Sequence, residues 1–272
     1  ELRDGPQERL LAHVDGLVIA GQPALTELLD PVLADEDADP WRAAAVALTL
    51  LAYPSRAVSD RLFSELGNVP EPVREGIVSA LSMSERGDLD ARLRDAIRHG
   101  GDPATLQALL SIGAARGIDP GELPRKLLES SDASLRAAAL SMLAFGDRRY
   151  LAWVEHSTTA SEPEVARAAA RAGLVMGSAQ AWQWAGRWGL ADEPDREAMV
   201  WLACFAEPRI LERLIARVED EATRADALWA LGFSGRREAA EVCLRWLGDE
   251  TVGPLAGEAF AAITGLDLED DT

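Results

Sequence analysis

The stretch that decides the fold is residues 149–174, which read Arg-Tyr-Leu-Ala-Trp-Val-Glu-His-Ser-Thr-Thr-Ala-Ser-Glu-Pro-Glu-Val-Ala-Arg-Ala-Ala-Ala-Arg-Ala-Gly-Leu. A mostly apolar run up to Glu155 is followed by a polar turn, and a second run opens at Glu162-Pro163. An acidic side chain accepts hydrogen bonds from the free N–H groups at a helix start. Proline suits the first helical position because its missing N–H needs no partner there. The stretch therefore predicts two consecutive α-helices.

The opening of the second helix returns along the whole chain. An acidic residue, often followed by Pro, opens an Ala-rich stretch every 28 to 32 residues. The eight anchors are Asp39, Glu71, Asp102, Asp132, Glu162, Glu193, Glu221 and Glu250. A fixed period of this size is typical of stacked repeats, in which no repeat buries its apolar face without its neighbours. Ala, Leu, Arg and Glu favour helices, so we expect an all-α chain, a right-handed α–α superhelix of about eight helical hairpins.

No linker is long enough to divide the chain, so we predict a single domain over residues 1–272. Residues 1–21 hold a capping helix, residues 22–264 hold the repeats, and residues 265–272 form an acidic tail. The predicted repeats are 22–52, 55–84, 88–115, 120–145, 147–176, 179–205, 208–232 and 236–264. The glycines expected to end helices in the left-handed conformation are Gly146, Gly177, Gly232 and Gly248.

Composition restricts the partners of this protein. Apolar residues make up 48% of the chain, enough for a substantial core, and the formal net charge is −19. That charge repels nucleic acid and anionic membranes at long range and attracts basic proteins. The longest apolar run, residues 43–53, is too short to span a bilayer, and no secretory signal opens the chain. We expect a soluble, cytoplasmic protein whose partner is another protein, most readily a basic one.

Several second helices resemble known repeat proteins. The openings Asp-Pro-Trp-Arg-Ala-Ala-Ala (39–45) and Asp-Ala-Ser-Leu-Arg-Ala-Ala-Ala-Leu (132–140) resemble HEAT repeats, close to the short bilin-lyase-like variety. Residues 9–21 and 232–266 are similar to a bacterial HEAT-repeat family of unknown function, often encoded beside type VI secretion genes. Members of that family extend further at both ends, so we expect a shorter version or part of a longer protein. The resemblance implies a secretion-linked, protein-binding role and supplies no catalytic residues.

An arginine recurs at one position of five predicted second helices. The five are Arg42, Arg74, Arg136, Arg196 and Arg224. We interpret them as a structural ladder in which each guanidinium binds turn carboxylates and carbonyls of the adjoining repeat, since its planar fork suits such pairing. The alternative is a basic stripe that binds phosphate or carboxylate ligands. The acidic residue at every turn favours the ladder.

Counting from that arginine indicates which side chains face away from the core. The first following residue is Ala43, Glu75, Ala137, Glu197 or Ala225, and the fifth is Ala47, Ser79, Ser141, Trp201 or Trp229. In HEAT proteins the second helices line the concave surface. Large aromatic residues on such a surface are common anchors for a partner. We therefore predict a partner-binding site that contains Trp201, Trp229, Glu197, Ser141 and Glu75. In the alternative interpretation, curvature buries the two tryptophans against each other.

Other chemistry-bearing residues favour structural roles. Trp182, Trp184 and Trp188 are interpreted as core packing of one first helix rather than a surface for stacking bases. The three histidines lie far apart with no metal-ligand spacing, and the two cysteines, in different repeats, are expected to be reduced and buried. We predict neither a metal nor a cofactor.

Three functions are compatible with these observations. The favoured one is a non-enzymatic scaffold, adaptor or chaperone that holds a protein partner and is linked to bacterial type VI secretion. An alternative is an immunity protein that neutralises a basic toxin through charge complementarity. Another alternative is a bilin lyase-like enzyme that attaches a tetrapyrrole, which rests on the repeat type alone.

Overall fold

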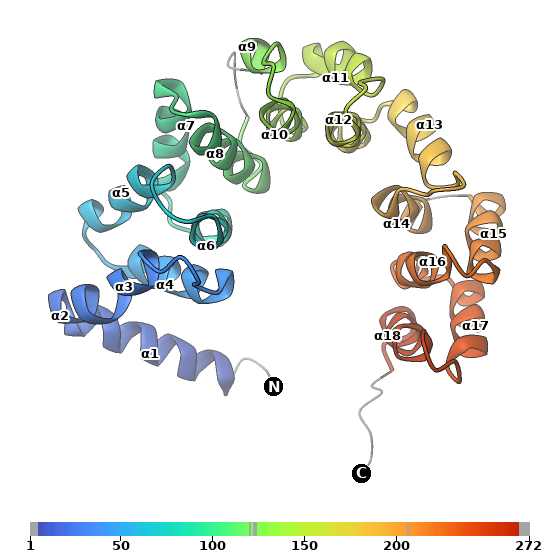
Figure 1. The fold of residues 1–272 in the computed structure, drawn as a ribbon, viewed down its shortest axis with the longest axis horizontal. Coiled ribbons are helices and arrows are strands. Elements are labelled where there is room, and N and C mark those ends of the chain that lie inside the picture. Colours follow the sequence, from blue (N-terminus) through green and yellow to red (C-terminus); the bar gives the residue numbers. More distant parts are fainter. Residues whose placement is uncertain (1–4, 120, 122–123, 206, 267–272) are drawn as a thin grey trace. The chain divides into compact units, whose positions relative to one another are not determined.

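A computed structural model of the chain describes residues 5–119, 121, 124–205 and 207–266 (Figure 1). The regular secondary structure of these residues is entirely helical, and helices pack mainly on helices close to them in sequence, which confirms the predicted all-α fold. Contacts divide the chain into two compact parts, an N-terminal block (Glu1–Ser178) and a C-terminal block (Ala179–Thr272). Each block is described by itself, and one continuous domain over residues 1–272 stays a prediction.

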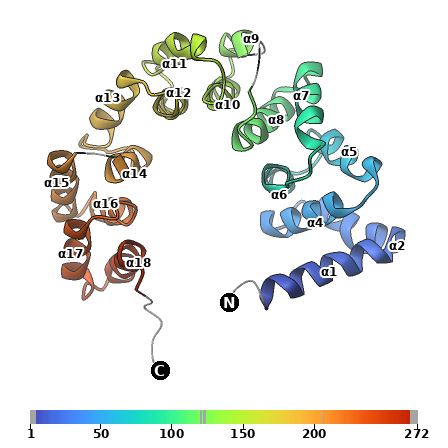
Figure 2. The ribbon, with the colours of Figure 1, turned by 180° about the vertical axis from the view of Figure 1, so that it is seen from behind.

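The N-terminal block consists of α1 (Pro6–Ala20) followed by five helix pairs (Figures 1 and 2). Its first helices are α5 (Arg56–Glu65), α7 (Leu89–His99), α9 (Pro124–Leu128) and α11 (Leu151–Ser157), the last preceded by the 3-10 turn η3 (Arg148–Tyr150). In the first pair this helix is divided into α2 (Gln22–Ala24), the π-helix η2 (Leu25–Leu29) and α3 (Asp30–Leu33). Its second helices are α4 (Pro40–Ala52), α6 (Glu71–Met83), α8 (Pro103–Ala115), α10 (Ala133–Leu143) and α12 (Pro163–Val175).

The C-terminal block continues the same construction with three pairs. Its first helices are α13 (Ala179–Trp188), α15 (Pro208–Ala216), prolonged by the 3-10 turn η4 (Arg217–Glu219), and α17 (Arg237–Trp246). Its second helices are α14 (Arg196–Phe205), α16 (Arg224–Leu231) and α18 (Gly253–Thr264). In both blocks each second helix packs on the next second helix, so the second helices form one layer and the first helices another. The described helix pairs fall inside the predicted repeat boundaries.

Aspartate, rather than glutamate, caps those second helices that have a side-chain cap. The capping residues are Asp39, Asp102, Asp132 and Asp195, and each accepts a hydrogen bond from a backbone N–H two or three residues ahead. Asp249 binds N–H groups of the turn that precedes α18. The predicted anchor Glu193 is wrong as a cap because Asp195 takes the role. Among the described residues no side chain caps α6, α12, α16 or α18, so the anchors Glu71, Glu162, Glu221 and Glu250 are wrong as caps too. The aspartate carboxylate lies one bond closer to the backbone, which lets it reach N–H groups of the first turn.

Gly177 and Gly232 are both predicted to end a helix in the left-handed conformation, but the structure requires glycine at these two positions for different reasons. Gly177 has a φ of 78° and confirms the left-handed helix end. Gly232 has a φ of −55°, so the prediction is wrong there. A Cβ on Gly232 would lie 3.2 Å from the Cα of Ala259 on α18, so this glycine serves the close approach of α16 and α18. Neither Gly146 nor Gly248 has a positive φ in the part of the chain that the structure describes.

Pro31 accounts for the irregular first pair. Proline has no N–H and its ring clashes with the carbonyl four residues earlier, which prevents a regular α-helical turn. The chain widens to the π-helix η2 (Leu25–Leu29) immediately before α3. The first helix of this pair is therefore divided into three segments, which the spacing of the acidic anchors does not indicate.

Small residues set the distance between neighbouring second helices. Six alanines of this layer that are at most 5% exposed are Ala43, Ala47, Ala80, Ala108, Ala139 and Ala169. On α6, a Cβ at Gly76 would lie 2.6 Å from the carbonyl oxygen of Pro40 and 2.6 Å from the Cβ of Ala43 on α4. Both layers supply large core side chains: Leu62 and Leu93 of first helices are fully buried, and so are Leu50 and Ile77 of second helices. Closely packed second helices and leucine-rich first helices together bury the core of each block.

Replacing Gly76 with Ala tests this close approach. The added methyl would overlap α4, so Gly76→Ala should lower the free energy of unfolding by about 1–3 kcal/mol. Gly16 on α1 is the matched control, because no heavy atom lies within 4 Å of the position of its Cβ. Gly16→Ala should raise stability by up to about 1 kcal/mol, since alanine favours helix. Urea unfolding of both variants measures the effect, and an unchanged midpoint for Gly76→Ala would contradict the packing.

Acid should weaken the capped helix starts. The Thr105 hydroxyl and the N–H groups of Thr105 and Ala104 hold the pKa of Asp102 below its usual value. A lowered folded-state pKa means that stability is present above the unfolded pKa, about 3.9, and is lost as pH falls below it. Asp102→Ala should lower the melting temperature at pH 7, with the difference from wild type shrinking at about pH 3 and below. A difference that stays constant over this range would contradict the role of the ionised cap.

Candidate functional site

Four of the five predicted ladder arginines occupy one register of the second helices. They are Arg74, Arg136, Arg196 and Arg224. Counting forward from each, the residues at the third, sixth and seventh positions are at most 3% exposed. The core face predicted from the sequence is therefore correct for α6, α10, α14 and α16. In α4 the same buried pattern is counted from Ala44, since Ala47, Leu50 and Leu51 are buried.

The ladder arginines of the N-terminal block bind the turn that precedes their helix. Arg74 donates from Nε to the carbonyl oxygen of Leu66 at 2.8 Å. Arg136 donates to the carbonyl oxygen of Ser130 at 2.7 Å and to Oε1 of Glu162, in the next repeat, at 2.6 Å. These guanidinium groups satisfy carbonyls in the connections between helices and, at Arg136, join one repeat to the next.

In the C-terminal block the ladder arginines stack on tryptophans of the following pair. The guanidinium carbon of Arg196 lies 3.9 Å from the ring centre of Trp229, and its Nε lies 3.2 Å from Oδ1 of Asp226. Arg224 lies 4.1 Å from the ring centre of Trp246. A cation over an aromatic face is attracted by the ring quadrupole, so these contacts hold the two rings in defined orientations.

Arg42 lies outside the ladder. Its side chain is exposed, and among the described residues it has no hydrogen-bond or ion-pair partner. The reason is the register: Ala44, two residues further on, takes the ladder position of α4. The anchor spacing of 32 residues between Asp39 and Glu71 therefore differs from the 30-residue spacing between Ala44 and Arg74 that packing follows.

A second series of structural arginines, Arg86 and Arg116, was not identified from the sequence. Arg86 donates from Nη1 to the carbonyl oxygens of Leu51 and Tyr53, both at 3.0 Å. Arg116 does the same one repeat later, donating to the carbonyl oxygen of Leu81 at 3.0 Å. Both guanidiniums therefore bind the carbonyl end of the preceding second helix, where the helix dipole favours positive charge. The 30-residue spacing of the two arginines was the available signal.

Four aromatic residues lie on the solvent-facing side of α14 and α16, and we call them the aromatic patch: Trp201, Phe205, Trp229 and Phe233. Both tryptophans are half-buried, whereas Phe205 is 74% and Phe233 is 52% exposed. Each phenylalanine follows its tryptophan by four residues, which places Trp201 and Phe205 on one face of α14, whereas Phe233 lies in the turn just after α16. The rings of Trp229 and Phe233 meet edge to face at 5.0 Å. The sequence predicted the tryptophans and missed the phenylalanines one helical turn later.

The two predicted anchor tryptophans have different neighbours. Trp201 lies 6.0 Å from Trp184 between ring centres and also packs on the buried core of the block. Among the described residues, the ring contact of Trp229 is with Phe233 rather than with Trp201. Core packing is correct for Trp184, which is buried, but Trp188, 5.9 Å from it, is largely exposed. The rings of Trp188, Trp184 and Trp201 therefore form a contact chain in which Trp184 is buried and the other two reach the surface.

Glu197 lies one residue beyond Arg196, in the first turn of α14 and one turn before Trp201, and is half-buried. Glu75 and Ser141 lie on α6 and α10 of the N-terminal block. Glu75 is exposed and lines a hollow of about 150 Å³ between α6 and α8. Ser141 lines a hollow of about 250 Å³, and its hydroxyl donates to a backbone carbonyl of its own helix at 3.0 Å. The predicted site residues thus share one face of the second helices, with Glu75 and Ser141 in the N-terminal block and Glu197, Trp201 and Trp229 in the C-terminal block.

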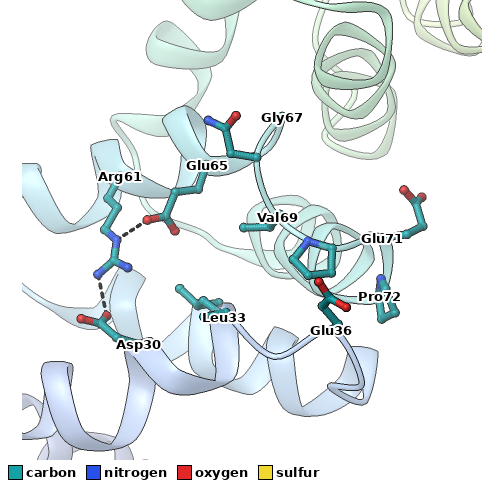
Figure 3. Close-up of a pocket in the computed structure, with 12 residues that line it drawn as sticks. Asp30, Leu33, Glu36, Arg61, Glu65, Gly67, Val69, Glu71 and Pro72 are labelled. Carbon is teal, nitrogen blue, oxygen red and sulfur yellow. Dashed lines mark hydrogen bonds and ion pairs between the residues drawn. The ribbon is translucent and has the colours of Figure 1, made fainter.

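An acidic pocket of about 760 Å³ lies between α3, α5 and the connection from α5 to α6 (Figure 3). Arg61 binds Oδ1 of Asp30 and Oε1 of Glu65, both at 2.5 Å, as the dashed lines show. Glu36 and Glu71 also line the pocket, and Oε2 of Glu65 is buried without a hydrogen-bond partner. The pocket therefore holds more carboxylates than Arg61 neutralises, and it favours cationic groups.

The described residues contain no group of three His, Cys, Asp or Glu side chains placed to hold a metal ion. Both cysteines are free thiols, and burial raises the pKa of each. None of the helices in the described ranges combines the length and the apolar composition that crossing a bilayer requires. Comparisons with known protein families and with curated proteins find no match to this chain.

Arginine substitutions test the corrected register. Arg74 is 19% exposed in its side chain and binds two carbonyls and Glu71, so Arg74→Ala should cost about 1–3 kcal/mol of stability. Arg42→Ala is the matched control and should stay within about 0.5 kcal/mol of wild type. Thermal or urea unfolding measures both. Equal losses would show that Arg42 belongs to the ladder after all.

Proposed function

We propose that this protein is a non-enzymatic binding scaffold, an adaptor or chaperone, that holds a protein partner on the solvent-facing side of its second helices. The observation that carries the proposal is the aromatic patch. Aromatic side chains are enriched at the energetic centres of protein interfaces because they bury large areas with few rotatable bonds. Two phenylalanines at least half exposed, each four residues after a tryptophan, are the arrangement expected of such a centre.

The contacts around the patch support a preorganised surface. Arg196 lies between Asp226 and the ring of Trp229, so the ring orientation is fixed before a partner binds. Trp201 packs against the ring of Trp184 and against the buried core of the block. A surface that is ordered in advance loses less side-chain entropy on binding. A cytoplasmic location and a link to type VI secretion are part of this proposal and rest on the sequence alone.

An immunity protein that neutralises a basic toxin is the second candidate. The net charge of −19 and the acidic pocket around Arg61 favour it. Long-range attraction would accelerate association with a basic partner, and salt would slow it. An association rate that falls steeply between low and physiological salt therefore favours this candidate, whereas a general scaffold would show a weaker dependence.

The double variant Phe205→Ser with Phe233→Ser tests the patch. Both side chains are exposed, so the variant should keep its helical circular dichroism while capture of the partner falls by about tenfold or more. The measurement is affinity capture from a native lysate, read by quantitative mass spectrometry and compared with wild type.

The matched control is Leu244→Ser, which removes a half-exposed apolar side chain from the first helix α17. It should leave capture unchanged. The proposal fails if the double variant captures the same proteins as wild type. Trp201→Ala and Trp229→Ala are less decisive because both rings are half-buried and their loss should also lower stability.

A further inference from the structure

An exposed apolar side chain recurs at the end of consecutive second helices in the N-terminal block. It lies nine residues after the helix position that the ladder arginine occupies. That position is Arg74 in α6 and Arg136 in α10, and it is filled by Leu106 in α8 and Ala166 in α12. The four residues are Met83, Ala115, Phe145 and Val175, and we call them the apolar ridge. The three large ones are 46% to 58% exposed. Phe205 and Phe233 of the aromatic patch occupy the same position in α14 and α16.

The register of the ridge is fixed by the core. In α8 the residues Leu109 and Ile112, and in α12 the residues Ala169 and Ala172, are buried at the same offsets that are buried in α6 and α10. Helices α6, α8, α10 and α12 also pack on one another in that order. The ridge therefore follows the C-terminal ends of four neighbouring helices: Met83, Ala115 and Val175 are the last residues of α6, α8 and α12, and Phe145 lies two residues beyond the end of α10.

Phe145 connects two of these positions. Its ring lies 3.6 Å from where a Cβ of Gly117 would be, just beyond the end of α8. Gly117 has a φ of 65°, so the backbone there both requires glycine and leaves room for the ring. The apolar surface thus extends from the end of α10 toward the end of α8.

The edge that carries the ridge favours positive charge. The second helices end there, and helix C-termini carry a partial negative charge from their free carbonyls. Arg86 and Arg116 show that guanidinium groups bind at this edge, since they donate to the last carbonyls of α4 and α6. Acidic residues also outnumber basic ones over the whole chain, 46 to 27. A segment that covers the ridge should therefore carry basic side chains beside its apolar ones.

The spacing of the ridge selects the conformation of that segment. Neighbouring packed helices lie about 8–10 Å apart, which sets the distance between successive ridge residues. Residues seven apart in an α-helix lie about 10.5 Å apart on one face. In an extended strand, same-face residues recur at about 6.8 Å or 13.6 Å, neither of which matches. A helix laid across the second helices can therefore present one apolar residue to each.

We propose that the apolar ridge binds a basic amphipathic α-helix of a protein partner. The helix lies across α6 to α12, places an apolar residue at about every seventh position against the ridge, and directs Arg or Lys side chains to the helix C-termini. This inference rests on the proposed function, since it names the chemistry of the partner, and it adds a second contact surface in the N-terminal block.

Dye-labelled synthetic peptides provide the test. The probe is an amphipathic peptide of about 22 residues (about six turns) with a Leu for each of the four ridge positions, one at every seventh position, Ala beside it and Arg or Lys elsewhere. Fluorescence anisotropy should show saturable binding to the full chain that weakens as salt rises. A scrambled peptide of the same composition should bind at least about tenfold more weakly, because its apolar residues no longer share a face.

The double variant Phe145→Ser with Val175→Ser should weaken peptide binding by about tenfold or more, with helical circular dichroism unchanged. Leu244→Ser is again the matched control and should bind as wild type does. Equal binding of the scrambled peptide, or unchanged binding by the double variant, would overturn the inference.

Further readouts separate this inference from its competitors. If the ridge variant binds the peptide normally while Phe205→Ser with Phe233→Ser loses partner capture, the inference fails and the proposed function stands. If the patch variant retains partner capture and the ridge variant loses the peptide, the ridge inference stands and the proposed role of the aromatic patch fails. A wild-type dimer that the ridge variant converts to monomer in sedimentation would assign the ridge to a second copy. Ridge-dependent binding to phosphatidylcholine vesicles would assign it to lipid, and either result overturns the helix.

Discussion

Close packing of neighbouring second helices is the constraint on which the rest of the structure depends. Alanines line the layer, and on α6 the absence of a side chain at Gly76 lets the helix approach Pro40 and Ala43 of α4. Because α6, α8, α10 and α16 each pack on a second helix on both sides, their buried positions are fixed and the remaining face has to point to solvent. That face therefore recurs in one register from pair to pair, and any residue type placed on it forms a line across the helices.

The polar residues at the two ends of the second helices complete this arrangement. Aspartates bind the free N–H groups at the starts, and Arg86 and Arg116 bind carbonyls at the ends of preceding helices. The ladder arginines Arg74 and Arg136 bind carbonyls of the turns between helices, and Arg136 also joins adjacent repeats through Glu162. Much of the charge of this acidic protein thus has a structural role, while the pocket around Arg61 retains carboxylates in excess. The surface that is left for a partner combines negative charge with exposed apolar side chains.

The solvent-facing side of the second helices differs between the blocks in a way that suits two kinds of contact. In the C-terminal block, Trp201, Phe205, Trp229 and Phe233 form a patch whose rings are held by neighbouring side chains. In the N-terminal block the same helix face is polar along most of its length, with Ser141 and Glu75 on it, and becomes apolar only at the ridge.

The sequence by itself determined the helical repeat and its boundaries. The acidic anchors, the alanine-rich runs and the turn residues are local signals, and the described helix pairs fall inside the repeat boundaries that these signals predict, although α14, α16 and α18 begin three residues after their predicted anchors. Local signals also identified Trp201 and Trp229 as outward-facing, because a residue's angle around a helix follows from counting within that helix.

The tertiary structure alone decided which residues meet between helices. It placed Ala44 rather than Arg42 at the ladder position, because packing on α1 and α6 fixes the rotation of α4 and the acidic anchor does not. It also stacked Arg196 on Trp229, paired Trp201 with Trp184, and aligned Met83, Ala115, Phe145 and Val175 into one ridge. These relations join residues about thirty positions apart, and no local pattern encodes the distance or the rotation at which two neighbouring helices pack.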